Sequence, residues 1–314
     1  MLTTQKTLIV LGGSGFIGRH VIQEALKAGW KVKALVRSAR SANGVSALGS
    51  MTFQGNAERP NEWIRETEGA SAILDLIQPK LPARVGRKQV LQISMQRQKF
   101  ASALVGALRS LNADQRPILI SVSGVDDLAP DQDGCLSANS PLRTKDYGFS
   151  PIGIPVRTII GKSGIGTAFV SLGTVYGPGK AFAETIFPKL AKGKWKNFGD
   201  RMALIHVEDA ARGLIKVADS DSSRVAGRSF VLTDNCPAEM SAFFGLSAEC
   251  MSVTPPGRIP RWLASIVAGR PIVETMLCDL PIKSSVHDLP DFQLRYPTYR
   301  EGLPAVLAKL GYIR

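Results

Sequence analysis

The feature that most constrains the fold is a glycine-rich turn near the start of the chain. An apolar run over residues 6–11 predicts a buried strand, and apolar residues at helical spacing predict a helix over residues 16–27. Glycines stand at positions 12, 15 and 18, between the two. This spacing permits a tight turn, close approach of a pyrophosphate to the backbone, and packing of the helix on the strand. A turn without a ligand is the alternative. We predict a dinucleotide site at the helix N-terminus, formed by Gly12, Gly13, Ser14, Gly15, Phe16, Ile17 and Gly18.

Strand and helix patterns alternate through the first half of the chain. Further strands are expected at residues 31–36, 51–53, 72–77, 117–122 and 167–172, and a long helix at residues 90–111. Such alternation predicts an α/β fold of the Rossmann type, a doubly wound parallel sheet with helices on both faces. We expect this dinucleotide-binding domain to span residues 1–176. Residues 177–314 are expected to form a smaller C-terminal α/β substrate-binding part, partly interleaved with the first.

The residues after the second predicted strand favour one cofactor over another. A site for NAD(H) usually has a carboxylate there, about 20 residues past the glycines, which binds the ribose 2′-hydroxyl. This chain instead has Arg37, Ser38 and Arg40, with no Asp or Glu nearby. The guanidinium groups suit a 2′-phosphate, and the serine hydroxyl can donate to it. We therefore predict NADP(H) in preference to NAD(H); two solvated arginines at a strand end are the alternative.

Composition excludes several other classes of protein. The chain has 39 lysines and arginines against 26 aspartates and glutamates, a net charge of +13. These basic residues are spread along the chain, whereas nucleic-acid binders more often concentrate them, so no nucleic acid is expected. No apolar run approaches the ~18 residues of a membrane span, so no membrane association is expected. The four cysteines form no CxxC pair, which favours reduced thiols in the cytoplasm and no metal site.

Five segments together resemble one known family. They are the glycine turn, the strand at 118–123, and the stretches 175–179, 205–211 and 296–303. The chain is similar in these to the extended or atypical short-chain dehydrogenases/reductases, the NAD(P)-dependent epimerase/dehydratase superfamily. The resemblance implies that Asn56, Ile77, Gln78 and Pro79 lie along the cofactor. Family members often pair through helices beside the sheet, so a homodimer is an open expectation.

The family's catalytic dyad is degenerate in this chain. In the family a Tyr-x-x-x-Lys pair does the chemistry, and a Ser or Thr at the end of the fifth strand binds the substrate oxygen. Ser123 stands in the serine position, and Tyr147 is the best match to the tyrosine. The fourth residue after Tyr147 is Pro151 rather than lysine, and Lys162 lies too far along the chain. Counting back from Tyr176 places the expected tyrosine between about 147 and 149.

One acidic residue is a further catalytic candidate. Asp75 ends an apolar run, at the carboxyl end of the fourth predicted strand. A carboxylate there faces the cofactor cleft, as an acid/base or a substrate anchor, or is simply hydrogen-bonded at the strand end.

Three functions are compatible with these residues. The first is an NADP(H)-dependent oxidoreductase or epimerase-like enzyme acting on a small molecule, with Tyr147 as acid/base beside Ser123. The second is a redox-neutral cyclase or isomerase on the same fold, with Asp75 as the acid. The third is a non-catalytic NADP(H)-binding protein, because the dyad is missing while the glycine turn is kept. We rank them in this order.

Overall fold

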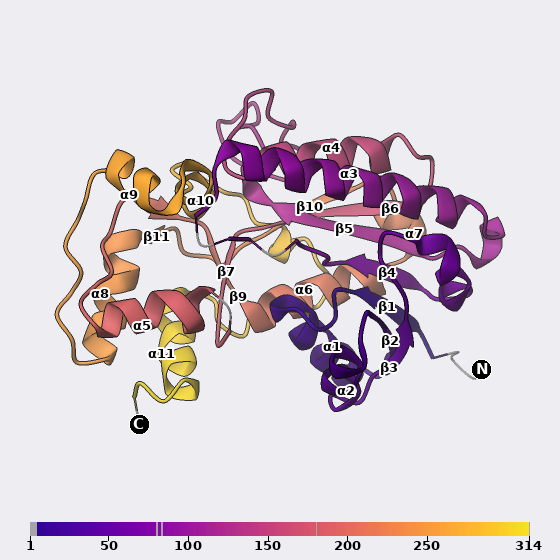
Figure 1. The fold of residues 1–314 in the computed structure, drawn as a ribbon, viewed down its shortest axis with the longest axis horizontal. Coiled ribbons are helices and arrows are strands. Elements are labelled where there is room, and N and C mark those ends of the chain that lie inside the picture. Colours follow the sequence, from indigo (N-terminus) through magenta and orange to yellow (C-terminus); the bar gives the residue numbers. More distant parts are fainter. Residues whose placement is uncertain (1–4, 80, 83, 180, 314) are drawn as a thin grey trace.

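The computed structural model describes residues 5–79, 81, 82, 84–179 and 181–313. Its centre is a seven-stranded sheet in the order β10-β6-β5-β4-β1-β2-β3, in which every neighbouring pair is parallel (Figure 1). The strands are β1 Thr7–Leu11, β2 Lys31–Val36, β3 Met51–Gln54, β4 Ala72–Asp75, β5 Ile118–Gly124, β6 Thr167–Leu172 and β10 Ser229–Leu232. The predicted Rossmann-type doubly wound sheet is thus confirmed.

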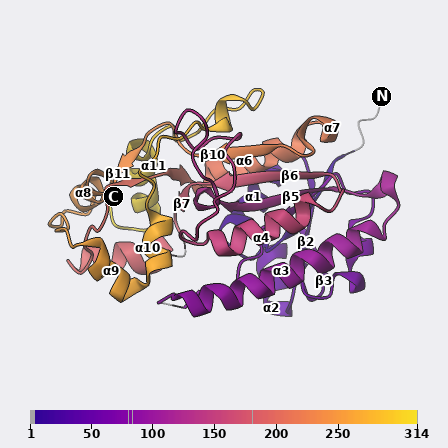
Figure 2. The ribbon, with the colours of Figure 1, turned by 90° about the horizontal axis from the view of Figure 1, so that it is seen from above.

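Helices cover both faces of this sheet. One face carries α3 (Arg87–Arg109) and α4 (Ser150–Gly161), which lie side by side in Figures 1 and 2. The other carries α1 (Phe16–Lys27) and α6 (Val207–Asp219), with α2 (Ala39–Ser46) near β3. The chain therefore crosses from one face to the other, as the alternating pattern predicts.

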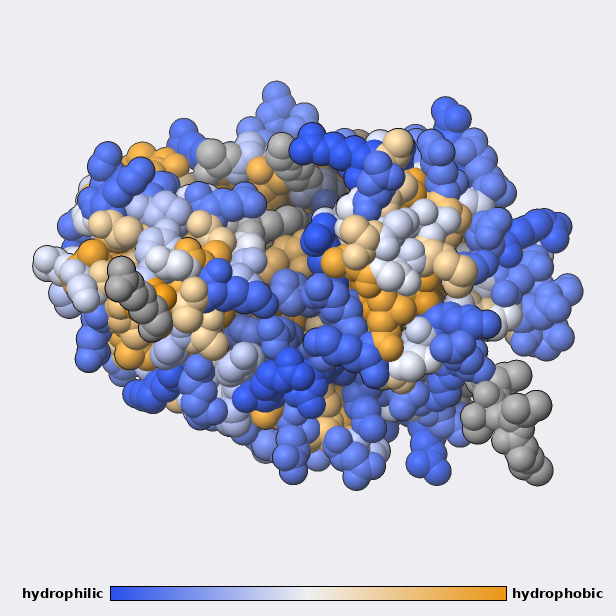
Figure 3. Space-filling model, turned by 90° about the horizontal axis from the view of Figure 1, so that it is seen from below, coloured by the Kyte–Doolittle hydropathy of each residue, from blue (hydrophilic) through white to orange (hydrophobic). Residues whose placement is uncertain are grey.

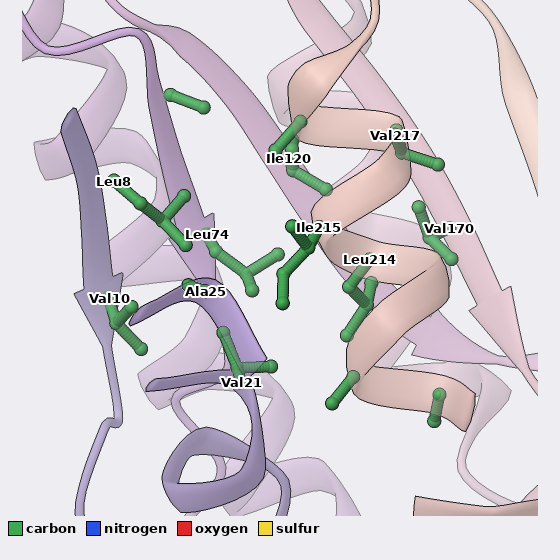
Figure 4. Packing of buried hydrophobic residues seen from close by; sticks show 14 of the residues in the cluster. Leu8, Val10, Val21, Ala25, Leu74, Ile120, Val170, Leu214, Ile215 and Val217 are labelled. Carbon is green, nitrogen blue, oxygen red and sulfur yellow. The ribbon is translucent and has the colours of Figure 1, made fainter. Parts of the chain in front are cut away.

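Side-chain alternation along β1 shows why both faces are apolar. Leu8 and Val10 join the core beneath α1 and α6, where Leu214 and Ile215 also pack (Figure 4). Ile9 and Leu11 point the other way, into the core beneath α3 and α4. A strand buried on both faces reads as a continuous apolar run, which is the pattern seen in the sequence.

The remaining elements gather mainly beyond the carboxyl ends of the strands (Figure 2). They have their own core, centred on Tyr176, Phe187, Phe243 and Leu303. The elements are β7 Thr174–Tyr176, α5 Phe187–Ala191, β8 Arg201–Met202, β9 Leu204–His206, β11 Ala238–Glu239, α8 Met240–Cys250, α9 Arg261–Ala268, α10 Arg270–Met276 and α11 Tyr299–Lys309. The short helix α7, Ser222–Val225, lies at the opposite end of the molecule, and its Val225 packs in the core of the central sheet (Figure 2). Because α6 and β10 return to the central sheet, the C-terminal half is interleaved with the first; a boundary at residue 176 stays a prediction.

The fourth strand and the long helix differ in their bounds from the predicted ones. The fourth strand was expected to reach residue 77 but ends at Asp75, whose Oδ1 accepts the amide of Ile77 at 3.1 Å and turns the chain. The long helix begins at Arg87, three residues earlier than its apolar spacing indicates.

None of the helices in the described residues has the length and apolarity needed to cross a membrane. The face seen in Figure 3 is mostly hydrophilic, with apolar side chains in scattered patches.

Candidate cofactor and substrate site

The glycine turn forms a cradle that side chains would fill. Gly12 has a φ of +87°, and a Cβ there would lie 2.8 Å from the carbonyl oxygen of Leu76. A Cβ on Gly18 would collide with the Gly12 carbonyl. The amide of Gly15 donates to the Gly12 oxygen at 2.9 Å, which closes the turn. The helix α1 then begins at Phe16 with no acidic residue in its first turn and no side-chain cap. Its first N–H groups are therefore available to a phosphate.

The two arginines that follow β2 lie on the surface of the protein. Arg37 and Arg40 are both exposed, and among the described residues neither forms an ion pair. Ser38 caps α2: its Oγ accepts the amide of Ser41 at 3.3 Å. The cap fixes the start of α2, so Arg37 stands between the carboxyl end of β2 and the cap, and Arg40 lies in the first turn of the helix; β2 pairs with β1, the strand that leads into the glycine turn.

Asn56, at the end of β3, has a structural role in holding its own loop. Its Oδ1 accepts the amide of Glu58 at 3.0 Å, and its carbonyl accepts Nε1 of Trp63 at 2.8 Å. The side chain is exposed. Contact between Asn56 and a cofactor stays a prediction, as do those of Ile77, Gln78 and Pro79 in the segment after β4.

Both oxygens of Asp75 are already engaged. Oδ1 accepts the Ile77 amide, and Oδ2 accepts Nη2 of Arg97 from α3 at 2.7 Å. Both side chains are buried. Arg97 could not be found from the sequence, because its partner lies 22 residues away on a different element. A carboxylate with two buried donors is held in place, which accords with the strand-end alternative for Asp75.

Ser123, at the end of β5, lies beside a buried pair of carboxylates. Asp126 and Asp127 belong to a short 3-10 turn, Val125–Asp127, directly after the strand. Neither the Ser123 hydroxyl nor Oδ2 of Asp127 has a hydrogen-bond partner among the described residues. Burial raises the pKa of the Asp127 carboxyl to about 8, the carboxylate of Asp126 adds to the rise, and the nearby Ser123 hydroxyl and Arg157 oppose it.

Asp127 packs closely against Gly153 on α4. Four residues after Tyr147, where the spacing of the dyad would place its lysine, stands Pro151; Gly153 would take that position only for a tyrosine at 149. A Cβ on Gly153 would lie 2.5 Å from Cγ of Asp127, so the carboxyl group fills that space. One turn later on α4, Arg157 donates to the hydroxyls of Ser171 and Ser229 at 2.9 and 3.1 Å. The sequence showed both aspartates only as part of a turn-rich segment; their position directly after a buried strand was the available signal.

Tyr147 precedes α4 and lines a pocket between the two halves of the chain. Its hydroxyl donates to the carbonyl of Leu277 at 3.4 Å, and the Arg143 guanidinium lies 4.6 Å from its ring centroid. Burial raises the pKa of the Tyr147 phenol, and the carboxylates of Glu274 and Asp279 add to this. Lys162 caps the far end of α4 and is exposed, so it does not join Tyr147. The role of Tyr147 as acid/base stays a prediction.

Comparison with known proteins agrees with this geometry. Residues 12–144 match the NAD(P)H-binding protein family. A 69-residue segment is 35% identical to photosystem II assembly factor Ycf39 of Trieres chinensis and covers 22% of each chain. A 145-residue segment is 27% identical to the chloroplastic SDR39U1 homologue of Arabidopsis thaliana, an epimerase family protein, and covers 46% of this chain and 41% of that one. The chain thus spans less than half the length of these curated relatives.

Solved structures match over almost the whole chain. The human epimerase family protein SDR39U1 (isoform 2) with NADPH has a TM-score of 0.76 at 16% identity, over 96% of this chain and 99% of that one. UDP-glucuronic acid 4-epimerase from Bacillus cereus, in complex with UDP-glucuronic acid and NAD, has a TM-score of 0.74 at 15% identity, over 97% and 99%. At such low identity these structures speak for the fold. The chain thus contains a segment, residues 12–144, that matches the NAD(P)H-binding family, and it has the fold of the epimerase-family structures named above.

Proposed function

We propose that the protein is an NADP(H)-dependent oxidoreductase acting on a small molecule. The observation that carries this proposal is the pair of exposed arginines, Arg37 and Arg40, at the carboxyl end of β2 beside the glycine turn. A 2′-phosphate distinguishes NADP(H) from NAD(H), and guanidinium groups bind phosphate through charge-assisted hydrogen bonds. The turn at Gly12, Gly15 and Gly18 would hold the pyrophosphate. The bound cofactor would supply or accept a hydride.

The chain's own residues would supply the proton. Ser123, at the end of β5, is half-buried with its hydroxyl oxygen covered, and the carboxyl group of Asp127 lies buried near it. A carboxyl group with a pKa of about 8 carries a proton at neutral pH and can pass it through the serine hydroxyl to a substrate oxygen. Arg157 then faces the carboxylate that is left. This assignment gives Asp127 the proton-handling task, whereas Tyr147 contacts the substrate from the pocket side.

A non-catalytic NADP(H)-binding protein is the second candidate. It is supported by Pro151 in place of a dyad lysine and by the partial match to an assembly factor. The redox-neutral enzyme has less support, because both oxygens of its proposed acid, Asp75, are engaged. That the protein is cytoplasmic and pairs as a homodimer stays a prediction.

Titration with NADPH and NADH, followed by nicotinamide fluorescence, tests the proposed cofactor. We expect micromolar binding of NADPH and binding of NADH that is weaker by roughly 10- to 100-fold, since one charged hydrogen bond contributes about 1.5–3 kcal/mol. The double variant R37Q/R40Q should lose this preference and keep its affinity for NADH. Arg59→Gln, an exposed arginine paired with Glu62, is the control. No binding of either cofactor to the wild type would overturn the proposal, and binding without any substrate turnover would favour the second candidate.

A further inference from the structure

The pocket that contains Tyr147 lies where the two halves of the chain meet. It has a volume of about 560 Å³, within the range of small-molecule sites. One wall is the N-terminal end of α3, and the facing wall is formed by α9 and α10. The two walls are joined where the amide of Val85 donates to the carbonyl of Ala268 at 3.1 Å. Gly148 forms part of the lining, with the Asp126 carboxylate behind it.

Three arginines give this pocket a positive charge. Arg270 pairs with Glu274 at 2.5 Å, and Arg87 lies 4.0 Å from Asp146. Among the described residues, Arg84 has no ion-pair partner, although it lines the same space. The lining therefore holds one more cation than carboxylate. Glu274 also accepts the amide of Gly148 at 2.9 Å, so both of its oxygens are engaged, and Arg84 is the lining cation without a carboxylate partner among the described residues.

The N-terminal end of α3 adds to this positive field. The amide of Gly86 donates to the side-chain oxygen of Gln89 at 3.1 Å, and the helix starts at Arg87. Its first turn contains no acidic residue and instead begins with Arg87 and Lys88. Acidic residues are normally favoured at this end of a helix because of its partial positive charge. Because the first turn is basic, no carboxylate of that turn neutralises the partial positive charge of the helix N-terminus, and that charge can attract an anionic ligand.

Exposed apolar side chains continue outward from both walls. Seven large apolar side chains are strongly exposed in the described residues, and six of them come from α9, from α3 or from the loop before α3. On α9, Trp262 is 65% exposed and stands three residues before Ser265, which lines the pocket. On α3, Leu91 follows the lining residue Arg87 by four. Residues three or four apart are neighbours on a helix face, so Trp262 and Leu91 each stand next to a lining residue, outside the pocket itself. The other four are Leu81, Met95, Ile266 and Val267.

We propose that this pocket binds amphiphilic anions: small molecules with an apolar body and a carboxylate or phosphate group. The anionic group would lie among Arg84, Arg87 and Arg270, and the apolar body would lie against Trp262 and Leu91. This inference rests on the proposed function only in naming the substrate class for it; the binding itself needs no cofactor. Large exposed apolar patches beside a site commonly mark such ligand contacts.

Isothermal titration with matched probes tests the two halves of the proposal. We expect decanoate to bind the full-length protein, decanol to bind at least roughly tenfold more weakly because it lacks the charge, and inorganic phosphate to bind weakly because it lacks the chain. Arg84→Gln should weaken decanoate about tenfold and leave decanol unchanged. Trp262→Ala should weaken both. The controls are Arg59→Gln and Met51→Ala, an exposed arginine and an exposed apolar residue on other elements.

The outcomes separate this proposal from the proposed function and from a membrane-binding surface. Equal affinity for decanoate and decanol, or equal loss in the control variants, would overturn the pocket assignment. Binding to vesicles of anionic lipid without binding of monomeric decanoate would also overturn it, in favour of a membrane contact. NADPH affinity should be unchanged in Arg84→Gln and Trp262→Ala. Decanoate binding by a protein that does not bind NADPH would support the pocket and reject only the cofactor.

Discussion

The carboxylate of Asp75 and the guanidinium of Arg97 meet at 2.7 Å beneath α3, in a layer from which water is excluded. Asp75 comes from the end of β4, beside the glycine turn, and Arg97 comes from the middle of the helix that covers it. The pair therefore fixes the position of α3 relative to the strand ends that form the predicted cofactor site.

Removing one member of this pair should be costly. Arg97→Met leaves the Asp75 carboxylate buried without its cation, and we expect the free energy of unfolding to fall by about 3–5 kcal/mol. The double variant D75L/R97M should lose less, because it leaves no buried charge. Urea denaturation measures both. The control is Arg65→Met, which breaks an exposed pair with Glu68 and should cost less than about 1 kcal/mol. Additive losses in the double variant would contradict the coupling.

The glycine cradle makes a second prediction. Gly18→Ala forces a methyl group into the Gly12 carbonyl, so the turn must move. We expect a loss of roughly tenfold or more in NADPH affinity and of about 1–3 kcal/mol in stability. The matched control is Gly106→Ala on α3, where a Cβ meets nothing within 4 Å; it should stabilise the protein by about 0.5–1 kcal/mol. Unchanged NADPH affinity in Gly18→Ala would contradict the assignment of the cradle.

The fold could be predicted from the sequence because its signals are local. The run at residues 6–11, the glycines after it and the helical spacing that follows each depend on neighbouring residues. The candidate site depends on contacts between distant segments, which spacing does not show. The sequence does not show that Arg97 pairs with Asp75. Nor does it show that the carboxyl group of Asp127 occupies the space beside Gly153. The exposed apolar residues of α9 likewise suggest a ligand contact only because the fold places α9 across the pocket from α3.

The proton proposed on Asp127 can be detected through stability. A folded-state pKa of about 8, against an ordinary value of 3.8, means that the folded protein holds an extra proton between these limits. Stability from this group is complete below about pH 4 and is lost as pH rises towards 8. Asp127→Asn should remove that loss. The free energy of unfolding of the variant, relative to that of the wild type, should therefore rise by on the order of 3 kcal/mol between pH 5 and 8.

Asp234→Asn is the matched control for Asp127. Asp234 is also buried with an unpartnered Oδ2, and burial raises its pKa to about 7, but it lies far from Ser123 on the chain, after β10. Its variant should also flatten the stability curve while leaving any turnover unchanged. If the free energy of unfolding of Asp127→Asn changed with pH in the same way as that of the wild type, the Asp127 carboxyl group would be the ionised partner of Arg157. It could then not be the proton donor.

Tyr147→Phe separates substrate contact from acid/base catalysis. The phenol is protonated at neutral pH, the more so because its pKa is raised, and its hydrogen bond to the Leu277 carbonyl is long at 3.4 Å, so we expect it to turn and donate to a ligand in the pocket. Its loss should weaken decanoate binding by about 3- to 10-fold, the value of one hydrogen bond, without changing NADPH affinity. With a true substrate, KM should rise and kcat should change little. A fall in kcat at unchanged KM would instead identify Tyr147 as the acid/base.

Protonation of His206 should lower the free energy of unfolding in mild acid. Its Nδ1 accepts the amide of Glu208 at 3.2 Å at the start of α6, and its ring centroid lies 4.1 Å from that of Tyr296. Burial lowers the pKa of His206 to about 4, from an ordinary 6.5, so the folded protein holds the neutral ring. The unfolded chain binds the proton first. The stability contributed by the neutral ring is therefore complete above pH 6.5 and is lost as pH falls towards 4, by on the order of 3 kcal/mol.

His206→Asn tests this without removing the helix cap, because asparagine is a favoured residue at that position. The variant should be less stable than the wild type at pH 7, since it loses the ring packing. The difference between the two should shrink as pH falls from 6.5 to about 4.5, measured by urea denaturation at each pH. Comparing the two proteins at each pH cancels the opposite slopes from Asp127 and Asp234. Parallel stability curves would show that His206 does not titrate in this way.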